Sequence, residues 1–244
     1  MATVIITAAA GGIGRAVAEA FTEAGYDLAL NDVDAGSLET LGKTLEHRTR
    51  VTLAAGDISD PEVRARLLQG AREQFGELRV LVNNAGIALP ESFPRAPRSA
   101  WRRLMEINLI APMELTQDVH PDLRSRGGAV VNVASTGGIG LAEYSDPDYA
   151  ATKAALIRLS AALGQVQDQP SVRVNAILPD WVHTAAVEKT RANTTPERWA
   201  QIAPERLVEP EEIGRVHDRS VVLPRTARRR ASARRSRDLA ATRR

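Results

Sequence analysis

The sequence predicts an α/β fold in which helices cover both faces of a doubly wound parallel sheet, as a three-layer αβα sandwich in a single domain. Short apolar runs alternate with longer segments of helical period, and the alternation repeats five times along the chain. Parallel neighbouring strands need crossover connections, which helices supply, so this alternation has one economical solution. A chain of 244 residues with 43% apolar residues is long enough to bury the core of such a fold.

Six apolar runs are the expected strands, at residues 3–7, 27–31, 50–55, 80–83, 129–134 and 172–178. Helical patterns begin near Gly12, Ala35, Asp60, Arg98 and Asp146. The ligand of a doubly wound sheet binds beyond the carboxyl ends of its strands. Several glycines and polar residues follow the predicted strands directly, so we expect them to share one ligand site.

The composition excludes several kinds of site. The chain has no cysteine, which excludes disulfides and thiolate metal sites, and its four histidines lack metal-ligand spacing, so no metal site is predicted. No apolar stretch is long enough to span a bilayer, and the N-terminus shows neither a basic region nor a cleavage signal. We therefore expect a soluble cytoplasmic protein with no membrane partner.

The net charge is unevenly distributed. Residues 216–244 contain ten Arg and two Asp, a local charge of +8, so residues 1–215 carry −6 of the total of +2. We expect residues 1–215 to form the folded domain and residues 216–244 to be an atypical Arg-rich tail. Because the net positive charge comes from that tail, the pI near 9.3 does not favour nucleic acid as a partner of the whole protein.

A glycine-rich segment connects the first predicted strand to the first predicted helix, and residues 7–14 read TAAAGGIG. Glycines let the backbone turn tightly and approach a pyrophosphate, which the helix N-terminus holds with free N–H groups and its dipole. The alternative is a turn that only connects a strand with a helix. Alone, the segment is a weak indication of a Rossmann-like dinucleotide site.

Asp32 follows the second predicted strand, eighteen residues after Gly14. In that position a carboxylate accepts hydrogen bonds from the adenosine ribose and repels a 2′-phosphate. This favours NAD as the cofactor and does not exclude NADP. The alternative is an ordinary turn-forming Asp, a role for which Asp34 is equally suited.

Tyr149 and Lys153 lie one helical turn apart. Asp146 suits the N-cap and Pro147 the first helical position, so both side chains share one face of the helix. An adjacent ammonium and a helix N-terminus both favour the phenolate, so we expect the pKa of Tyr149 to be lowered and the phenol to serve as an acid or base. Taken by itself, a chance pair on a solvated helix face is the commoner explanation.

The ordered set of motifs resembles the short-chain dehydrogenase/reductase family. That family carries T-G-x-x-x-G-x-G after the first strand, N-N-A-G after the fourth, an Asn in the following helix, a Ser after the fifth strand, and then Y-x-x-x-K. This chain has Thr7, Gly12, Gly14, residues 83–86, Asn108, Ser135, Tyr149 and Lys153, in that order and at similar spacing, from residue 3 to about residue 215. The resemblance implies an NAD(P)-dependent enzyme that interconverts an alcohol and a carbonyl.

The resemblance also implies a role for each matching residue. Tyr149 is implied to exchange the proton of the substrate oxygen, Lys153 to lower the pKa of that phenol and bind the nicotinamide ribose, and Ser135 to hydrogen-bond the reacting oxygen. Asn108 is implied to position a water for proton relay. The implied cofactor contacts are Thr7, Gly12, Ile13, Gly14, Asp32, Asp57, Ile58, Asn84, Ala85, Gly86, Tyr149, Lys153, Pro179, Val182 and Thr184.

These cofactor contacts divide by the part of the dinucleotide they meet. Residues 12–14 are implied to meet the pyrophosphate, residues 57–58 the adenine, residues 84–86 the adenosine side, and Thr184 the carboxamide. Taken singly, other readings exist: a strand-end turn for Ser135, a buried polar group for Asn108 and a helix cap for Asp57.

Three features depart from the family pattern. Ala8 replaces the first glycine of the cofactor loop, and its Cβ is expected to constrain the turn and weaken dinucleotide binding. Asp180 replaces the glycine of the Pro-Gly pair after the sixth strand and places a carboxylate near the expected nicotinamide. After residues 211–215 the last helix does not continue in the family's pattern, and its seventh strand and V-D-G-G-like turn are missing.

The abrupt change of composition in the tail resembles a GC-rich reading frame shifted out of phase. The alternative hypothesis is a natural basic arm that contacts nucleic acid or anionic lipid. We expect a homo-oligomer, a tetramer as in the family or a dimer if the tail is real, because the seventh strand contributes to tetramer packing in the family.

Substrate specificity is expected to reside in residues 88–100 and in the lid-like stretch 182–204, together with Trp181 and Trp199. The small-molecule candidates are a 3-oxoacyl thioester reduced with NADPH, a sugar or polyol, a steroid-like alcohol and a small hydroxy compound. Two functions of other classes compete. A catalytically silent NAD-binding regulator has no need of the Ser, Tyr and Lys set, and a nucleic-acid-binding protein rests on the tail alone.

Overall fold

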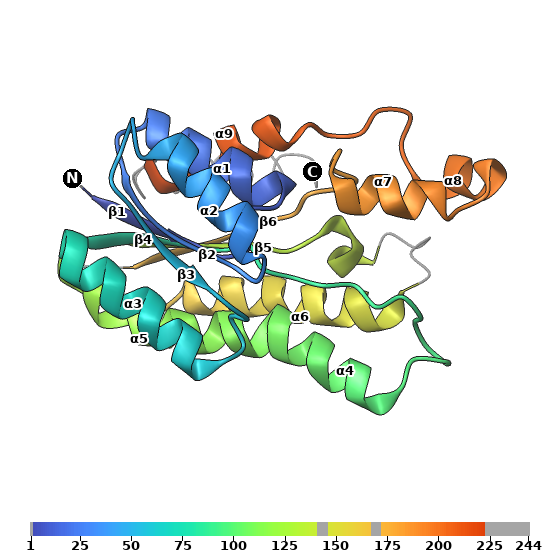
Figure 1. Cartoon of the computed structure of the whole chain (residues 1–244). Coiled ribbons are helices and arrows are strands. Elements are labelled where there is room, and N and C mark those ends of the chain that lie inside the picture. The colour runs from blue at the N-terminus through green and yellow to red at the C-terminus, as the bar shows by residue number, and fades with distance from the viewer. Residues whose placement is uncertain (1, 141–145, 167–171, 223–244) are drawn as a thin grey trace, which may run out of the picture.

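Six strands form one parallel sheet at the centre of the molecule (Figure 1). In this computed structural model the described residues are 2–140, 146–166 and 172–222. The strands are β1 (Thr3–Ile6), β2 (Asp27–Asp32), β3 (Val51–Ala55), β4 (Leu78–Asn83), β5 (Ala129–Val133) and β6 (Arg173–Ile177). They lie in the order β3-β2-β1-β4-β5-β6, each parallel to its neighbours. The predicted doubly wound α/β fold is confirmed.

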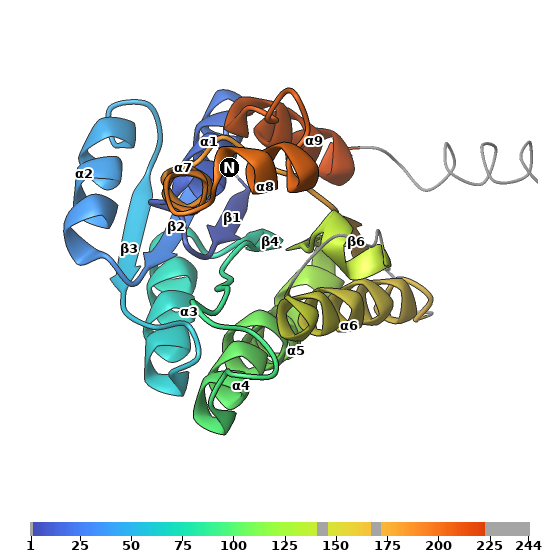
Figure 2. The same cartoon turned by 90° about the vertical axis from the view of Figure 1, so that its right-hand side faces the viewer.

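Helices cover both faces of the sheet (Figure 2). The helices are α1 (Gly12–Glu23), α2 (Ala35–Leu45), α3 (Pro61–Phe75), α4 (Arg98–Met105), α5 (Ala111–Arg126), α6 (Pro147–Leu163), α7 (Ala185–Ala192), α8 (Pro196–Ile202) and α9 (Pro210–Val222). Helices α1, α2 and α9 lie on one face, and α3, α5 and α6 lie on the other (Figure 1). A π-helical turn, Glu106–Ile110, joins α4 to α5, and a short 3-10 helix, Thr136–Ile139, follows β5.

Alternate side chains of each strand pack into two apolar layers, one on each face of the sheet. In β1, Val4 and Ile6 pack with Val17 and Phe21 of α1, whereas Ile5 joins the layer beneath α3 and α5. All three strand residues are fully buried, as expected for a parallel sheet that is covered on both faces. The two layers hold the strands in register, and the loops at their carboxyl ends therefore converge.

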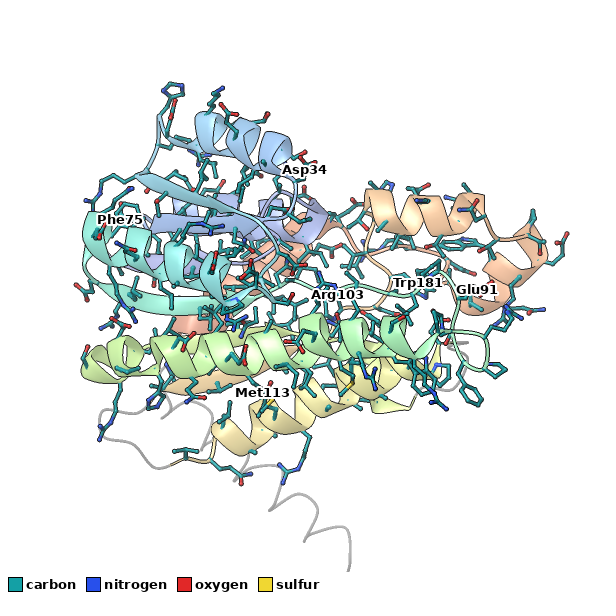
Figure 3. The ribbon with its side chains drawn as sticks, turned by 60° about the horizontal axis from the view of Figure 1, so that its bottom comes forward. Asp34, Phe75, Glu91, Arg103, Met113 and Trp181 are labelled. Atoms are coloured by element: carbon teal, nitrogen blue, oxygen red, sulfur yellow. The ribbon has the colours of Figure 1, made fainter. Side chains whose placement is uncertain are left out.

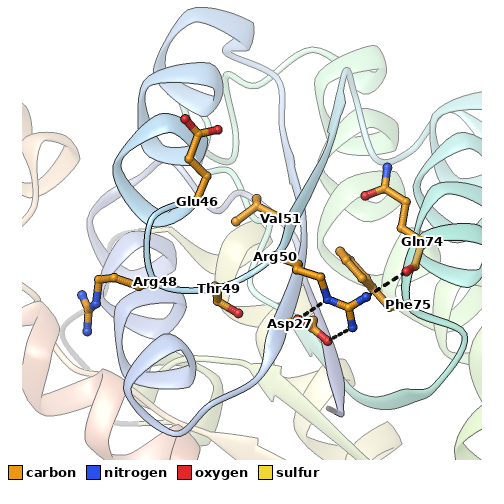
Figure 4. Close-up of a pocket in the computed structure, with 8 residues that line it drawn as sticks. All are labelled: Asp27, Glu46, Arg48, Thr49, Arg50, Val51, Gln74 and Phe75. Atoms are coloured by element: carbon orange, nitrogen blue, oxygen red, sulfur yellow. Dashed lines mark hydrogen bonds and ion pairs between the residues drawn. The ribbon is translucent and has the colours of Figure 1, made fainter.

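The amino-terminal edge of the sheet carries an ion pair between a buried Asp and an exposed Arg (Figure 4). The side chain of Asp27 at the start of β2 is fully buried and accepts two hydrogen bonds from Arg50, at 3.0 and 2.5 Å. The Arg50 guanidinium also lies over the ring of Phe75, 5.0 Å from its centroid. Because this hollow is at the edge opposite the glycine loop, we assign it to stability rather than to ligand binding.

Helix α9 closes the described part of the chain. Gly214 lets it pack closely on α1, since a Cβ there would lie 2.7 Å from the carbonyl oxygen of Ala16. No seventh strand follows within the described residues, and residues 223–244 of the Arg-rich tail lie outside them. Across the described ranges, no helix is both long and apolar enough to cross a membrane, and the cytoplasmic location stays a prediction.

Candidate active site

The loop after β1 is tied to the loop after β4. The Thr7 hydroxyl oxygen accepts hydrogen bonds from the backbone N–H groups of Asn84 and Ala85, at 3.0 and 2.9 Å. The Asn84 side-chain amide donates in return to the carbonyl oxygens of Thr7 and Ala8, both at 3.0 Å. These predicted cofactor residues therefore shape the floor of the cleft at the carboxyl ends of β1 and β4.

Different neighbours exclude a side chain at the glycines of the cofactor loop. A Cβ at Gly14 would lie 2.1 Å from the carbonyl oxygen of Ala8, so no side chain fits there. A Cβ at Gly12 would meet the methyl group of Thr184 at 2.6 Å, at the start of α7. The N-cap residue of α1 is Gly11, which offers no side-chain cap to the first N–H groups of the helix. This uncapped, glycine-lined helix N-terminus fits a pyrophosphate.

Ala8 adopts a backbone conformation that favours glycine. Its φ is +49°, in the left-handed region, where an L-residue with a Cβ is strained by about 1–2 kcal/mol. The predicted constraint at this first position of the loop is therefore present as strain. The loop nevertheless keeps its turn, because the Ala9 N–H donates to the carbonyl oxygen of Asn31 at 2.9 Å.

Asp32 stands beside the cofactor loop. One carboxylate oxygen accepts from the N–H of Ala10 at 2.9 Å, and the other accepts from the N–H of Asp34 at 3.0 Å. Asp34 instead caps α2, through its bonds with the N–H and hydroxyl of Ser37. Asp32 therefore stabilises its own turn and places a carboxylate next to the loop, and its contact with the cofactor ribose stays a prediction.

The predicted adenine contacts lie after β3. The Asp57 carboxylate accepts from the N–H and hydroxyl of Ser59, at 2.9 and 2.7 Å, and forms an ion pair with Arg103 of α4. The Ile58 side chain is buried beneath this turn. Sequence analysis did not identify Arg103, which is far from Asp57 along the chain and carries no motif.

Ser135, Tyr149 and Lys153 come together at the carboxyl ends of β5 and the start of α6. The Ser135 hydroxyl shares a hydrogen bond with the Tyr149 hydroxyl and also accepts from the N–H of Gly137 at 3.1 Å. The Lys153 side chain is 3% exposed, and its ammonium donates to the carbonyl oxygen of Val133 at 2.9 Å. The predicted proximity of the three side chains is therefore present.

Burial sets the proton affinities of this group. It raises the pKa of Tyr149; the hydrogen bond from Ser135 lowers that pKa, and the charge of Asp146 raises it further. The predicted lowering is wrong, because the effect of burial exceeds that of the hydrogen bond from Ser135. The Lys153 ammonium bonds to the Val133 carbonyl and lies 5.6 Å from the centre of the Tyr149 ring. Burial also lowers the pKa of Lys153 to about 8, which weakens its charge. At neutral pH Tyr149 is a neutral phenol, the form that donates a proton.

Asn108 lies in the π-helical turn and is fully buried. Its amide oxygen accepts from the N–H of Ile87 at 2.8 Å, and its amide nitrogen donates to the Ile87 carbonyl at 2.9 Å and to the Thr152 hydroxyl at 3.1 Å. Three contacts leave one lone pair on the amide. Asn108 thus fixes the loop after β4 against α6, and its predicted water relay stays a prediction.

Gly86 lies between Asn108 and Lys153. A Cβ at this position would stand 3.1 Å from the Lys153 ammonium nitrogen and 3.5 Å from the Asn108 amide oxygen. A larger residue would therefore press on the buried lysine. The predicted cofactor contact at Gly86 and the predicted catalytic lysine occupy the same part of the cleft.

The loop after β6 brings the remaining predicted residues to the cleft. Thr136 donates its N–H to the carbonyl oxygen of Pro179 at 3.0 Å and its hydroxyl to Asp180 at 3.2 Å. Thr184 caps α7, and its methyl group faces Gly12. The Val182 side chain is 4% exposed and belongs to the core, so only its backbone is available to a cofactor.

Helices α7 and α8 form the predicted lid-like stretch and project beyond the carboxyl ends of the strands (Figures 1 and 2). The rings of Trp181 and Trp199 pack edge to face, with centroids 5.1 Å apart. The Trp181 indole N–H also donates to the carbonyl oxygen of Ile202 at 2.9 Å, which ties α8 to the loop after β6. Figure 3 shows Trp181 at the end of the molecule opposite Phe75.

Known proteins are similar to this chain in sequence and fold. A family model described as short chain dehydrogenase matches residues 2–195. Oxidoreductase UcpA of Escherichia coli (strain K12) is 32% identical over 222 residues, which are 87% of this chain and 84% of UcpA. The 3-oxoacyl-(acyl-carrier-protein) reductase FabG of Thermotoga maritima is 30% identical over 217 residues, which are 87% of this chain and 87% of FabG. The crystal structure of L-sorbose reductase from Gluconobacter frateurii, complexed with NADPH and L-sorbose, is similar with a TM-score of 0.78 at 29% identity, over 88% of this chain and 87% of that one.

Proposed function

The chain belongs to the short-chain dehydrogenase family and is an NAD(P)-dependent oxidoreductase of alcohol and carbonyl groups, and from this premise we propose that Tyr149 is its general acid and base. The observation that carries the proposal is the contact between the Ser135 and Tyr149 hydroxyls, with the buried Lys153 ammonium 5.6 Å from the centre of the Tyr149 ring. A phenol and a second hydroxyl at one point are the groups that hold and protonate a carbonyl oxygen.

In the direction of reduction, the substrate oxygen accepts hydrogen bonds from the Tyr149 and Ser135 hydroxyls. The bound nicotinamide cofactor supplies the hydride in this direction and accepts it in the other. As negative charge develops on the substrate oxygen, Tyr149 donates its proton, for which its raised pKa keeps it ready at neutral pH. The phenolate left on Tyr149 is stabilised by the ammonium of Lys153. In the direction of oxidation the same phenolate takes the alcohol proton.

We propose NAD as the preferred cofactor because of Asp32. Its carboxylate stands beside the cofactor loop, where it would accept a ribose hydroxyl and repel a 2′-phosphate. NADPH in the L-sorbose reductase crystals is a reason to test this point directly. We expect wild type to bind NADH at least about tenfold more tightly than NADPH, and Asp32→Ser to abolish most of that difference. Equal affinities in wild type would overturn the preference.

The activity is tested with a panel of alcohols and carbonyl compounds, each with NAD(H) and NADP(H), by following nicotinamide absorbance. We expect turnover of at least one substrate class. Cofactor binding without turnover of any panel member would instead support a catalytically silent regulator. A second candidate, reduction of a 3-oxoacyl thioester with NADPH, is favoured by the similarity to FabG, and a thioester in the panel tests it.

We also propose that the chain forms a homo-oligomer through α4 and α5. Trp101, Met105 and Met113 are large apolar side chains that are 38%, 40% and 42% exposed. Apolar side chains gathered on exposed helix faces are typical of protein interfaces. Light scattering on the purified protein decides between a monomer and an oligomer.

A further inference from the structure

Asp180 is hydrogen-bonded to Thr136, the residue that follows Ser135. The Thr136 hydroxyl donates to the Asp180 carboxylate at 3.2 Å, and the Thr136 N–H holds the preceding Pro179 carbonyl at 3.0 Å. Thr136 is the direct neighbour of Ser135, whose hydroxyl is bonded to that of Tyr149. The hydrogen bond from Thr136 and the peptide bond between Thr136 and Ser135 therefore connect the carboxylate to the hydroxyls proposed to hold the substrate oxygen.

One oxygen of this carboxylate is available. Thr136 contacts Oδ1, and within the described residues neither an ion pair nor a further hydrogen bond engages Oδ2. The Asp180 side chain is exposed, and it carries no structural cap or buried contact. Its position next to the site, rather than the stability of the fold, accounts for a charged residue here.

An ionised carboxylate only accepts hydrogen bonds. Beside a reacting carbon it therefore favours a substrate with a hydroxyl group on a neighbouring carbon. It also repels a substrate carboxylate or phosphate, and one like-charge interaction in a partly exposed cleft changes affinity by about tenfold.

We propose that Asp180 is a specificity residue that accepts a hydrogen bond from a substrate hydroxyl adjacent to the reacting carbon. The substrate is then an uncharged polyhydroxy compound rather than a hydroxy acid or the thioester of an anionic carrier. This inference rests on the proposed alcohol and carbonyl chemistry at Tyr149, and it adds the substrate class.

The test compares wild type with Asp180→Asn on three probes: sorbitol, cyclohexanol and 3-hydroxybutyrate. We expect the substitution to lower kcat/KM for sorbitol about tenfold, to leave cyclohexanol within about twofold, and to raise 3-hydroxybutyrate about tenfold. Opposite signs on two substrates cannot result from a general loss of folded protein. Glu39→Gln is the matched control, because it removes one negative charge from exposed helix α2 and should change none of the three.

Binding gives a second readout that does not need turnover. Trp181 follows Asp180 directly, so its fluorescence in the presence of NAD should report sorbitol binding in wild type and weaker binding in Asp180→Asn. If all three probes shift together, or if 3-hydroxybutyrate binds no better to the variant, the inference is wrong. If no probe is turned over but the fluorescence titrations show the expected reversal, the proposed chemistry fails while the specificity role stands.

Discussion

The two sides of the cleft are formed by different kinds of chemical group, backbone on one side and side chains on the other. The cofactor side, at the start of α1, consists of backbone N–H groups and glycines that exclude a Cβ, as at Gly14. The proton-transfer side consists of buried or half-buried side chains, Ser135, Tyr149 and Lys153, around the ends of β5 and α6. A change on the first side costs strain, as at Ala8, but removes no chemical group. A change on the second side removes the chemistry itself.

A large effect that separates the two sides is expected from Lys153→Met. Met keeps the apolar part of the side chain and removes the ammonium, so kcat should fall by at least about a hundredfold. NADH affinity should fall much less, because the pyrophosphate is held on the other side of the cleft. Steady-state kinetics and NADH titration check this, and an unchanged kcat would contradict it.

The same variant should also alter the pH dependence of stability. Burial lowers the pKa of Lys153 from 10.5 to about 8, so between these two pH values the unfolded chain binds more protons than the folded chain. Wild type should therefore gain up to about 3 kcal/mol of unfolding free energy from this group as the pH rises through that window. Urea unfolding of wild type and variant at pH 7 and 10 measures the difference, and parallel curves would contradict it.

A smaller effect, on the cofactor side, is expected from Gly14→Ala. The added Cβ would lie 2.1 Å from the Ala8 carbonyl oxygen, so the loop must move, and NADH affinity should fall about tenfold to a hundredfold. Gly11→Ala is the matched control, since its Cβ would be 3.8 Å from the same oxygen, an ordinary contact. Equal losses in the two variants would mean that crowding at Gly14 is not the cause.

The smallest effect is expected from Ala8→Gly. Glycine adopts the φ of +49° without strain, although it gains entropy in the unfolded chain, so the net stabilisation should be about 0.5–1 kcal/mol. NADH affinity should rise a few-fold, and kcat should stay unchanged. Thermal unfolding and NADH titration check both quantities. A less stable Gly variant would show that the loop does not strain Ala8.

Much of the fold and the site follows from local patterns. The six strands and the turn spacing of Tyr149 and Lys153 follow from periodicity, and the start of α6 follows from Pro147 at its first position, although Asp146 makes no side-chain cap. The direction of the Tyr149 pKa was not predictable, because it depends on burial by distant segments. The ion pair of Asp57 with Arg103 joins the loop after β3 to helix α4, and no sequence spacing relates these two segments.

Of the departures from the family pattern, one was predictable from the sequence and one was not. A strained φ at Ala8 follows from knowing which turn the loop must make, because only glycine adopts it freely. The hydrogen bond from Thr136 to Asp180 depends on the ends of β5 and β6 being neighbours, and the sequence alone does not show this.

The most direct test of Tyr149 as the general acid and base is Tyr149→Phe, measured on any substrate that wild type turns over. Phe keeps the ring and removes only the hydroxyl, so kcat should fall by at least about a thousandfold, with NADH affinity and thermal stability close to wild type. Equal turnover in the two proteins would contradict the account.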